Sequence, residues 1–510
     1  MEPAKLQKRE YLTHRLIKIC GEEYVKFDRQ TVVEYSLNSC GDTVRPMYVV
    51  FPHTTEQISQ LVQFANEERL TLFPISRGQN FGYGNKQGTS AGQIILDLSL
   101  MNRVIAINPE LCYATVEAGV SQTQLYQTLQ KHPGRPLAMD VTGAGSNASI
   151  VGNLLERGFG HTDYGDRFSR IVNMKVVLPN ADVIQTGFGC FTHANALHTY
   201  RQGLGPVLEG LFSQSNLGIV TEVTIELMPK PEKNCMFIFS TPVENDLPKL
   251  VDTLRELRLQ NIINSTVHIA NKTRTVGDEN NRYVGAWNLS GSLSGPASIV
   301  NAKKKLIRKA FNTQFKHCKI WFITDRLLRF VQWVDKYITP IDTYPVIKDA
   351  FDLMKGIPSD SPIQTLLSQQ VDTSEIQVSK LPKHFQWICA VSEASADSLC
   401  KMQDITAALF AKHQYEYRVT FTSINPRSFI MIANITYEKT ESSMAKAQTF
   451  YKECTQVLSE AGFHPYRSGS GKYQYLSPRK KGYQNVLNQL KQCLDPNAIL
   501  APGKYNIGIP

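Results

Sequence analysis

The 510-residue sequence lacks the usual signs of a metal site, a disulfide framework or a membrane segment. None of its ten cysteines forms a C-x-x-C pair, and no histidine cluster stands beside them, so we expect no metal site. Cysteines this sparse favour free thiols in a reducing compartment. No apolar stretch is long enough to span a bilayer, and the first residues contain no apolar signal segment. We therefore expect a cytoplasmic location and no membrane contact.

The sequence also lacks an excess of one charge. The formal net charge is +10 over 510 residues. Basic triplets at 303–305 and 479–481 carry no interleaved aromatic residues, which argues against a nucleic-acid partner and favours solvated surfaces. An apolar content of 42% and a charged content of 20% are typical of globular proteins.

The segment 74–84, Pro-Ile-Ser-Arg-Gly-Gln-Asn-Phe-Gly-Tyr-Gly, follows an apolar run from Leu70 to Ile75. Glycines let backbone N–H groups crowd around an anion, as a pyrophosphate requires. No Lys-Ser or Lys-Thr pair follows, and glycines at 78, 82 and 84 do not have the Rossmann spacing. The segment predicts a phosphate cradle of another kind, and an ordinary glycine-rich turn is the alternative.

Further short, β-rich or glycine-rich segments follow in a defined order. They lie at 92–99, 101–108, 114–120, 140–146, 150–162, 165–166, 214–221 and 495–504. Their order resembles the FAD domain of the vanillyl-alcohol oxidase and para-cresol methylhydroxylase family. The resemblance covers about 45–230 and 455–510 well, and the middle of the chain only loosely.

The resemblance implies an α+β fold, with a two-lobed PCMH-type FAD-binding domain and an α/β cap built on an antiparallel sheet. We expect the FAD domain over 1–230, the cap or substrate domain over 231–454, and a C-terminal segment, 455–510, that returns to the FAD domain. The apolar spacing agrees with a change of character after Met228-Pro229. It predicts an amphipathic helix over 5–19 that packs on the body. In the middle of the chain it predicts helices over 246–259, 300–311 and 394–412, strands over 236–240, 419–422 and 429–435, and a loop over 357–380.

The same resemblance implies which residues contact FAD. They are Pro74, Ile75, Ser76, Arg77, Gly78, Gln79, Asn80, Gly82, Tyr83, Gly84, Asp140, Val141, Thr142, Gly143, Gly152, Asn153, Glu156, Arg157, Gly160, His161, Gly165, Gly218, Ile219, Val220, His384, Arg467 and Lys504.

The resemblance also implies a site for a phenolate oxygen made by Tyr83, Tyr466 and Arg467. Arginine stays charged and can pair with an oxyanion, while tyrosine hydroxyls donate directed hydrogen bonds. The alternative is that Tyr83 packs on the phosphate loop and Arg467 pairs with a carboxylate.

One position departs from the family. The relatives' oxidases place an aspartate beside the flavin where this chain has Gly143, and no acid follows through Ile150. We therefore expect dehydrogenation rather than hydroxylation, unless an acid such as Glu393 reaches in from the cap. Thr142 occupies a position where the family varies a residue affecting oxygen access, so molecular oxygen and a protein electron acceptor both remain open as oxidants.

Attachment of FAD is expected to be tight and non-covalent. Asn80 or Phe81 replaces the histidine that links FAD in some relatives, and no cysteine lies within 145–151. His384 is a candidate for a link from the cap, with a surface histidine as the alternative.

Two functions follow as alternatives. The first is an FAD-dependent oxidoreductase that removes hydride from a phenolic or related aromatic alcohol-like small molecule. The second is an FAD-binding flavoprotein with reduced or altered catalysis that acts as a subunit with an electron-acceptor partner. A homo-oligomer is expected in either case.

Overall fold

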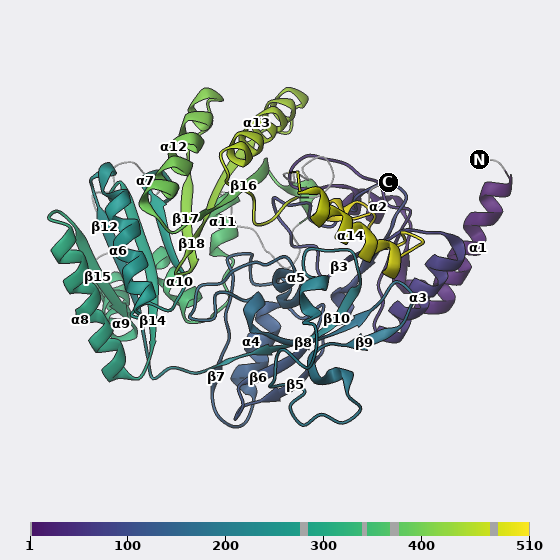
Figure 1. Ribbon diagram of the computed structural model, residues 1–510, viewed down its shortest axis with the longest axis horizontal. Coiled ribbons are helices and arrows are strands. Elements are labelled where there is room, and N and C mark those ends of the chain that lie inside the picture. The colour runs from purple at the N-terminus through teal and green to yellow at the C-terminus, as the bar shows by residue number, and fades with distance from the viewer. Residues whose placement is uncertain (1–2, 276–283, 339–343, 368–376, 470–477, 509–510) are drawn as a thin grey trace.

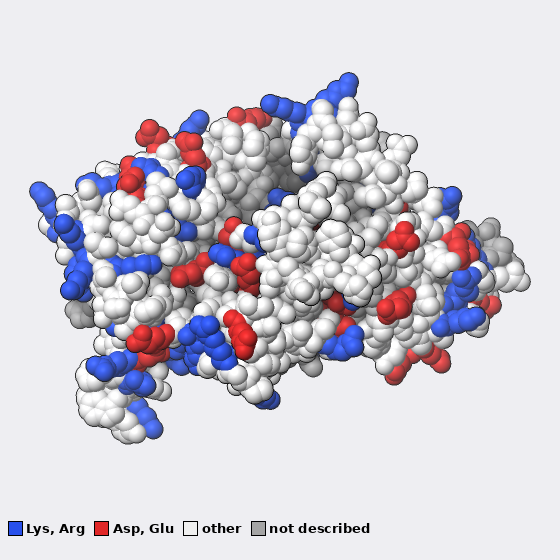
Figure 2. All heavy atoms as spheres, turned by 60° about the horizontal axis from the view of Figure 1, so that its bottom comes forward, with Lys and Arg blue, Asp and Glu red and all other residues white. Residues whose placement is uncertain are grey.

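The computed structural model describes residues 3–275, 284–338, 344–367, 377–469 and 478–508. Figure 1 shows two parts side by side, an N-terminal part on the right and a sheet covered by long helices on the left. No helix among these residues is long and apolar enough to cross a membrane. Basic and acidic side chains are interspersed over most of the face in Figure 2.

The described residues of the N-terminal part form two main sheets and a two-stranded sheet of β7 (Leu137–Ala138) and β11 (Met228–Pro229). A four-stranded sheet has the order β1-β2-β4-β3, in which β2, β4 and β3 are parallel. A five-stranded antiparallel sheet has the order β5-β6-β10-β8-β9. The strands are β1 (Val25–Lys26), β2 (Tyr48–Val50), β3 (Leu72–Ile75), β4 (Ile94–Asp97), β5 (Val104–Asn108), β6 (Tyr113–Glu117), β8 (Ile171–Val177), β9 (Val183–Gln185) and β10 (Ile219–Glu226).

Helices cover these sheets with one apolar face. The N-terminal helix α1 (Pro3–Cys20) buries Leu12, Leu16 and Cys20, spaced four residues apart, as the expected amphipathic helix requires. α3 (Thr55–Glu68) begins where the Thr54 side chain accepts a hydrogen bond from the backbone N–H of Gln57 at 3.2 Å. The other helices of this part are α2 (Arg29–Ser36), α4 (Gln122–Lys131) and α5 (Ile150–Leu155).

The second part is built on one seven-stranded antiparallel sheet of order β15-β12-β14-β13-β17-β18-β16. Its strands are β12 (Lys233–Thr241), β13 (Val267–Asn271), β14 (Trp287–Gly295), β15 (Lys319–Thr324), β16 (His384–Glu393), β17 (Val419–Asn425) and β18 (Ser428–Tyr437). The long helices are α6 (Leu247–Leu259), α8 (Ala297–Gln314), α9 (Asp325–Tyr337), α10 (Tyr344–Met354), α12 (Ala396–Lys412) and α13 (Glu441–Glu460). The antiparallel sheet predicted for the cap is confirmed.

Alternate residues of these strands face opposite sides. Val267 and Ile269 of β13 are buried in the core beneath the long helices, whereas His268 and Ala270 line a cavity. A period of two is the ordinary consequence of the pleated backbone. The sheet therefore has one face for the core and one for the cavity.

Each part has its own main core. The first runs from Leu12 to Leu227 and adds Leu353, Ile499 and Leu500 from later in the chain, and the second runs from Cys235 to Phe463 and adds Cys40. The expected boundary at 230 falls between these two stretches.

The C-terminal segment packs against the N-terminal part. Apolar residues of α14 (Lys481–Leu494) pack with Leu217 in a small cluster, and Leu500 forms a parallel bridge with Leu72 of β3. The buried Lys491 Nζ donates to Asp495 at 2.6 Å and to two backbone carbonyls, so both charges are satisfied.

The loop predicted over 357–380 was partly wrong. Residues Ser361–Leu367 form helix α11, and Val378–Lys380 form a short 3₁₀ turn, while 368–376 lie outside the described residues. Serine, proline and glutamine suggested a loop, but Ile363 and Leu381 pack with Phe81 and Phe385 in a small apolar cluster. Tertiary burial therefore overrides local composition here.

Candidate active site

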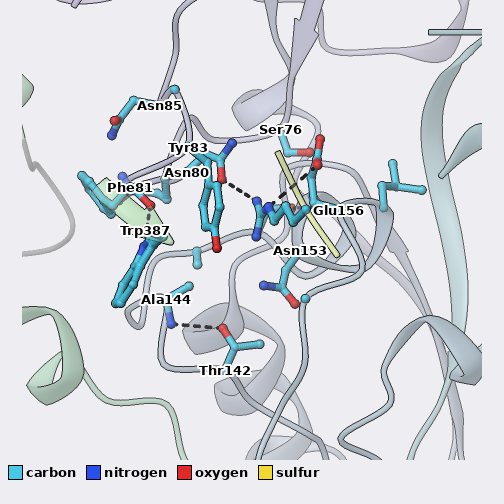
Figure 3. Close-up of a pocket in the computed structure, with 18 of the residues that line it drawn as sticks. Ser76, Asn80, Phe81, Tyr83, Asn85, Thr142, Ala144, Asn153, Glu156 and Trp387 are labelled. Atoms are coloured by element: carbon cyan, nitrogen blue, oxygen red, sulfur yellow. Dashed lines mark hydrogen bonds and ion pairs between the residues drawn. The ribbon is translucent and has the colours of Figure 1, made fainter. Parts of the chain in front are cut away.

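A cavity of about 490 Å³ lies between the glycine-rich segment, the segments around residues 142–161, the C-terminal segment and the inner face of the cap sheet. Figure 3 shows Tyr83, Asn80, Glu156 and Trp387 converging on it from these different elements. Residues far apart in the sequence therefore share one site.

The glycine-rich segment forms one wall. It leaves β3 at Ile75, and Gly78, Gly82 and Gly84 have φ of 65°, 74° and 126°, which L side chains rarely adopt. A Cβ on Gly82 would lie 2.3 Å from the Trp387 ring, so only glycine permits this approach.

Arg77 holds the segment in place through three hydrogen bonds. Its Nε and Nη1 donate to the carbonyls of Asn147 and Gly119 at 3.0 Å each, and its Nη2 donates to Asn147 Oδ1 at 2.8 Å. The arginine therefore ties the wall to two neighbouring loops.

The backbone N–H groups of Gly78, Gln79 and Asn80 make no hydrogen bond with any other part of the described structure, although all three residues line the cavity. Successive free N–H groups form a concave anion site. Opposite them, a Cβ on Gly152 would lie 3.0 Å from Ser76 Oγ, so the segment and α5 approach closely. These features fit the pyrophosphate of a dinucleotide, and the cavity beyond has room for an aromatic ring system.

Tyr83, Tyr466 and Arg467 meet at another part of the cavity. The Arg467 guanidinium carbon lies 4.5 Å from the centre of the Tyr83 ring, and its Nη2 donates to Asn80 Oδ1. Burial raises the pKa of Tyr466 to about 12 and that of Tyr83 well above its usual 10. Both hydroxyls are therefore protonated donors at neutral pH beside a permanent cation.

Arg467 also has an acidic neighbour. Its Nε lies 3.8 Å from Glu156 Oε2, and Lys504 Nζ lies 2.9 Å from Glu156 Oε1. Burial alone would raise the pKa of Glu156, but Lys504 and Arg467 lower it to about 2. One carboxylate thus faces two cations, which leaves net positive charge at this end of the cavity. The carboxylate pairing considered as an alternative for Arg467 is present together with the tyrosine contact.

A pair of histidines lies beside Gly143. His161 Nδ1 and His268 Nε2 are 2.9 Å apart, and His268 Nδ1 is 3.1 Å from Thr422 Oγ1. The buried His161 Nε2 has no hydrogen-bond partner among the described residues, and it lies 3.8 Å from where a Cβ on Gly143 would stand. Burial lowers the pKa of both rings, so both are neutral at neutral pH.

Most predicted cofactor residues line the cavity, but seven do not. These are Gly82, Asp140, Val141, Arg157, Gly160, Gly165 and His384.

Several of the seven support the wall from behind. Asp140 pairs with Arg167 at 3.3 Å and accepts hydrogen bonds from the backbone N–H groups of His161 and Thr162. A Cβ on Gly160 would collide with Asp140, which is why the chain is glycine there.

His384 lies at the start of β16. Its ring packs against Gly41 and against Tyr437, whose ring centre is 5.7 Å away. Glu393, considered as a replacement acid, is exposed at the far end of β16 and does not line the cavity either.

Sequence reasoning missed the cap wall. His268, Arg274, Trp387, Thr420 and Thr422 all line the cavity. They come from β13, the short helix directly after it, β16 and β17, and His268 and Thr422 are 154 residues apart. Only the alternation of polar and apolar residues in each strand could have indicated an inner face.

The described site is that of a dinucleotide-binding protein with an antiparallel cap over the cavity, and comparison with known proteins agrees. Residues 46–187 match the family model described as FAD binding domain. The chain is 30% identical over 490 residues to the 4-cresol dehydrogenase [hydroxylating] flavoprotein subunit of Pseudomonas putida, covering 91% of this chain and 88% of that one. It is 28% identical to the 1'-carboxy-chondrochloren decarboxylase of Chondromyces crocatus, covering 96% of each. The structure of the 4-ethylphenol oxidase from Gulosibacter chungangensis superposes with a TM-score of 0.85 at 26% identity, covering 99% of this chain and 98% of that one.

The chain therefore belongs to the family of FAD-linked oxidoreductases of the p-cresol methylhydroxylase type. The predictions of the family, of the fold class and of FAD as cofactor are confirmed.

Proposed function

We propose that this FAD-dependent oxidoreductase removes hydride from the benzylic carbon of a para-substituted phenol. The observation that carries this proposal is the convergence of Tyr83, Tyr466 and Arg467 on one end of a cavity that also contains the free N–H groups of the glycine-rich segment. The relatives named for 4-cresol and 4-ethylphenol support a phenolic substrate.

Tyr83, Tyr466 and Arg467, which we call the phenolate clamp, bind the phenolic oxygen as its anion. The Arg467 charge favours the phenolate electrostatically, and the two tyrosine hydroxyls donate hydrogen bonds to it. A phenolate releases hydride more easily than a phenol, because its negative charge stabilises the quinone methide that forms. FAD, when bound, accepts that hydride.

His161 provides the base that position 143 lacks. With a hydrogen on Nδ1, His161 donates to His268 and His268 donates to Thr422 Oγ1, which leaves the lone pair of His161 Nε2 directed into the cavity. This nitrogen can accept a proton from the substrate side chain after hydride has left, giving an alkenyl phenol, or from a water that adds to the same carbon. The former outcome agrees with the expected dehydrogenation.

FAD is held without a covalent bond in this proposal. The side chain of β16 that lines the cavity is Trp387, whose Nε1 donates to the carbonyl of Phe81 at 3.0 Å, and an indole of this kind offers no nucleophile. The electron acceptor is molecular oxygen or a partner protein. The relative named as a flavoprotein subunit favours the partner.

A second candidate function is loss of a carboxyl group coupled to hydride removal. The decarboxylase named above matches 96% of the chain at 28% identity, which favours this candidate over an unrelated chemistry.

Anaerobic mixing of the yellow protein with a panel of 4-alkylphenols tests the proposal. Each phenol is paired with its methyl ether, which cannot become a phenolate. We expect phenols to bleach the flavin absorbance and the ethers to leave it unchanged. Equal bleaching by both members of the pairs would contradict phenolate binding. Absence of bleaching by every compound would favour a flavoprotein with reduced catalysis.

A further inference from the structure

Arg274 is a second cationic group in the cavity, separate from the phenolate clamp. It lies in the short helix α7 (Lys272–Thr275), directly after β13, and its partly buried side chain lines the cavity from the cap. Its Nη1 donates to Asn434 Oδ1 at 2.8 Å, and its guanidinium carbon lies 5.7 Å from the centre of the Trp387 ring. The side chain is therefore held in one place by a neutral amide and an aromatic face.

No carboxylate among the described residues forms an ion pair with Arg274, and its Nε and Nη2 donate to none of them. Other buried arginines of the site differ in this respect. Arg167 pairs with Asp140 at 3.3 Å, and Arg467 lies 3.8 Å from Glu156. Arg77 has no acid, but all three of its nitrogen groups are bonded to carbonyl or amide oxygens. Within the described residues, Arg274 is the one of these four arginines that has neither an acidic neighbour nor a hydrogen bond at each of its nitrogen groups.

The surroundings of Arg274 make its positive charge unfavourable in the absence of an anion. Burial, and to a smaller extent Arg418, lower the pKa of Arg274 to about 10, so the guanidinium is still protonated at neutral pH. Arg418 itself is paired with Glu416 at 2.7 Å. His268 is neutral because burial, His161 and Arg274 lower its pKa. A partly desolvated cation without a counter-ion is costly, and an anion that enters the cavity would offset that cost.

We propose that Arg274 binds a carboxylate carried on the para side chain of the substrate. The inference rests on the proposed function, since it assigns a substrate class to the same site: phenols whose side chain bears a carboxylate. The planar guanidinium fork fits a carboxylate through its two free nitrogen groups. A single arginine beside a neutral amide suits one negative charge better than a phosphate dianion. The substrate is then held at both ends, with its phenolate at Arg467 and its carboxylate at Arg274.

The test compares matched acids and amides on the FAD-loaded protein. A series of 4-hydroxyphenyl alkanoic acids with one to four side-chain carbons, and the corresponding primary amides, is titrated anaerobically by stopped flow, which gives an apparent Kd and a limiting rate of flavin reduction. We expect at least one acid to bind 10-fold or more tightly than its amide. Arg274→Gln should reduce the ratio of the amide Kd to the acid Kd to about one without weakening the binding of the amide. Arg274→Lys should restore part of this ratio.

Arg418→Gln is the matched control, because Arg418 is a neighbouring cation that already has an acidic partner. It should leave the ratio unchanged, and FAD content and Tm of each variant establish that it is folded. If 4-alkylphenols reduce the flavin but no acid is preferred over its amide, or if Arg274→Gln keeps the preference, the inference is wrong and the proposed function stands. If no phenol of any kind binds or reduces the flavin, both are wrong.

Discussion

The two walls of the cavity are built in different ways. The cofactor wall consists of contiguous segments, such as 74–84, in which glycines expose backbone N–H groups. The cap wall consists of single side chains, such as His268, Thr422 and Trp387, from strands far apart in the chain. In our proposal, the first wall binds the charge of the cofactor through backbone groups, and the second presents specific side chains to the substrate.

Changing the cofactor wall should have the largest effect. Gly82→Val places a side chain 2.3 Å from the Trp387 ring at a φ of 74°, and we expect a loss of ~2–4 kcal/mol in stability together with most of the bound FAD. Thermal unfolding and the flavin absorbance of the purified variant measure both. Gly92→Val is the control, because Gly92 has a φ of 83° but nothing within 4 Å. If both variants lose the same stability and the same amount of bound FAD, backbone strain is responsible, and the contact between the two walls is not.

Removing the cation of the clamp should affect the substrate and not the cofactor. Arg467→Ala deletes a charge-assisted hydrogen bond, and we expect phenol binding to weaken by roughly 1.5–3 kcal/mol. Tyr83→Phe and Tyr466→Phe should each cost less, since a neutral donor is lost. Titration of the flavin spectrum with a phenol gives each Kd. Unchanged reduction by the substrate in all three variants would show that its oxygen is bound elsewhere.

The buried pair of His161 and His268 predicts how the stability of the protein depends on pH. Burial lowers the pKa of His161 and of His268 below the ordinary 6.5, so the unfolded chain binds these protons more readily than the folded protein does. Their contribution to stability is complete above about pH 6.5 and decreases as the pH falls below it. Chemical denaturation at pH 7 and at pH 5 gives the free energy of unfolding at each pH. Between these two values it should decrease less for His268→Gln than for the unmodified protein. An equal loss would mean that other groups dominate the acid sensitivity.

The same pair predicts a kinetic effect. His161→Gln removes the base at Nε2, and we expect turnover to decrease about 10²-fold or more while reduction of the flavin in the first turnover changes less. The acid limb of the pH–rate profile should disappear with it. Labelled water reports whether the product oxygen comes from solvent, which separates the alkenyl product from the alcohol.

The smallest effect is expected at His384. Acid precipitation should release FAD into the supernatant of the unmodified protein, and His384→Ala should bind the same amount, because His384 packs against Gly41 and Tyr437 outside the cavity. A yellow pellet after precipitation, lost in the variant, would establish a covalent link through this residue.

The sequence alone predicted the glycine-rich wall of the cavity, and its resemblance to the family predicted the antiparallel cap. Segment 74–84 and the turns after it are recognisable because a phosphate is bound by consecutive N–H groups, which requires glycine at fixed places in one stretch of chain. The apolar spacing at 246–259 and 429–435 gave the helix α6 and the strand β18 correctly, since each buries one face against the cap core.

Only the tertiary structure decided which side chains of the cap line the cavity. Nothing in the sequence places His268 Nε2 2.9 Å from His161 Nδ1, or places Arg274 beside Trp387 with no acidic partner in the part of the chain that the structure describes. These contacts depend on the register of a seven-stranded sheet and on how it covers the cofactor wall. A pleated strand directs alternate residues to opposite faces, so one residue of slip would exchange the cavity face for the core. The cofactor wall follows from local backbone geometry, and the cap wall follows from long-range packing.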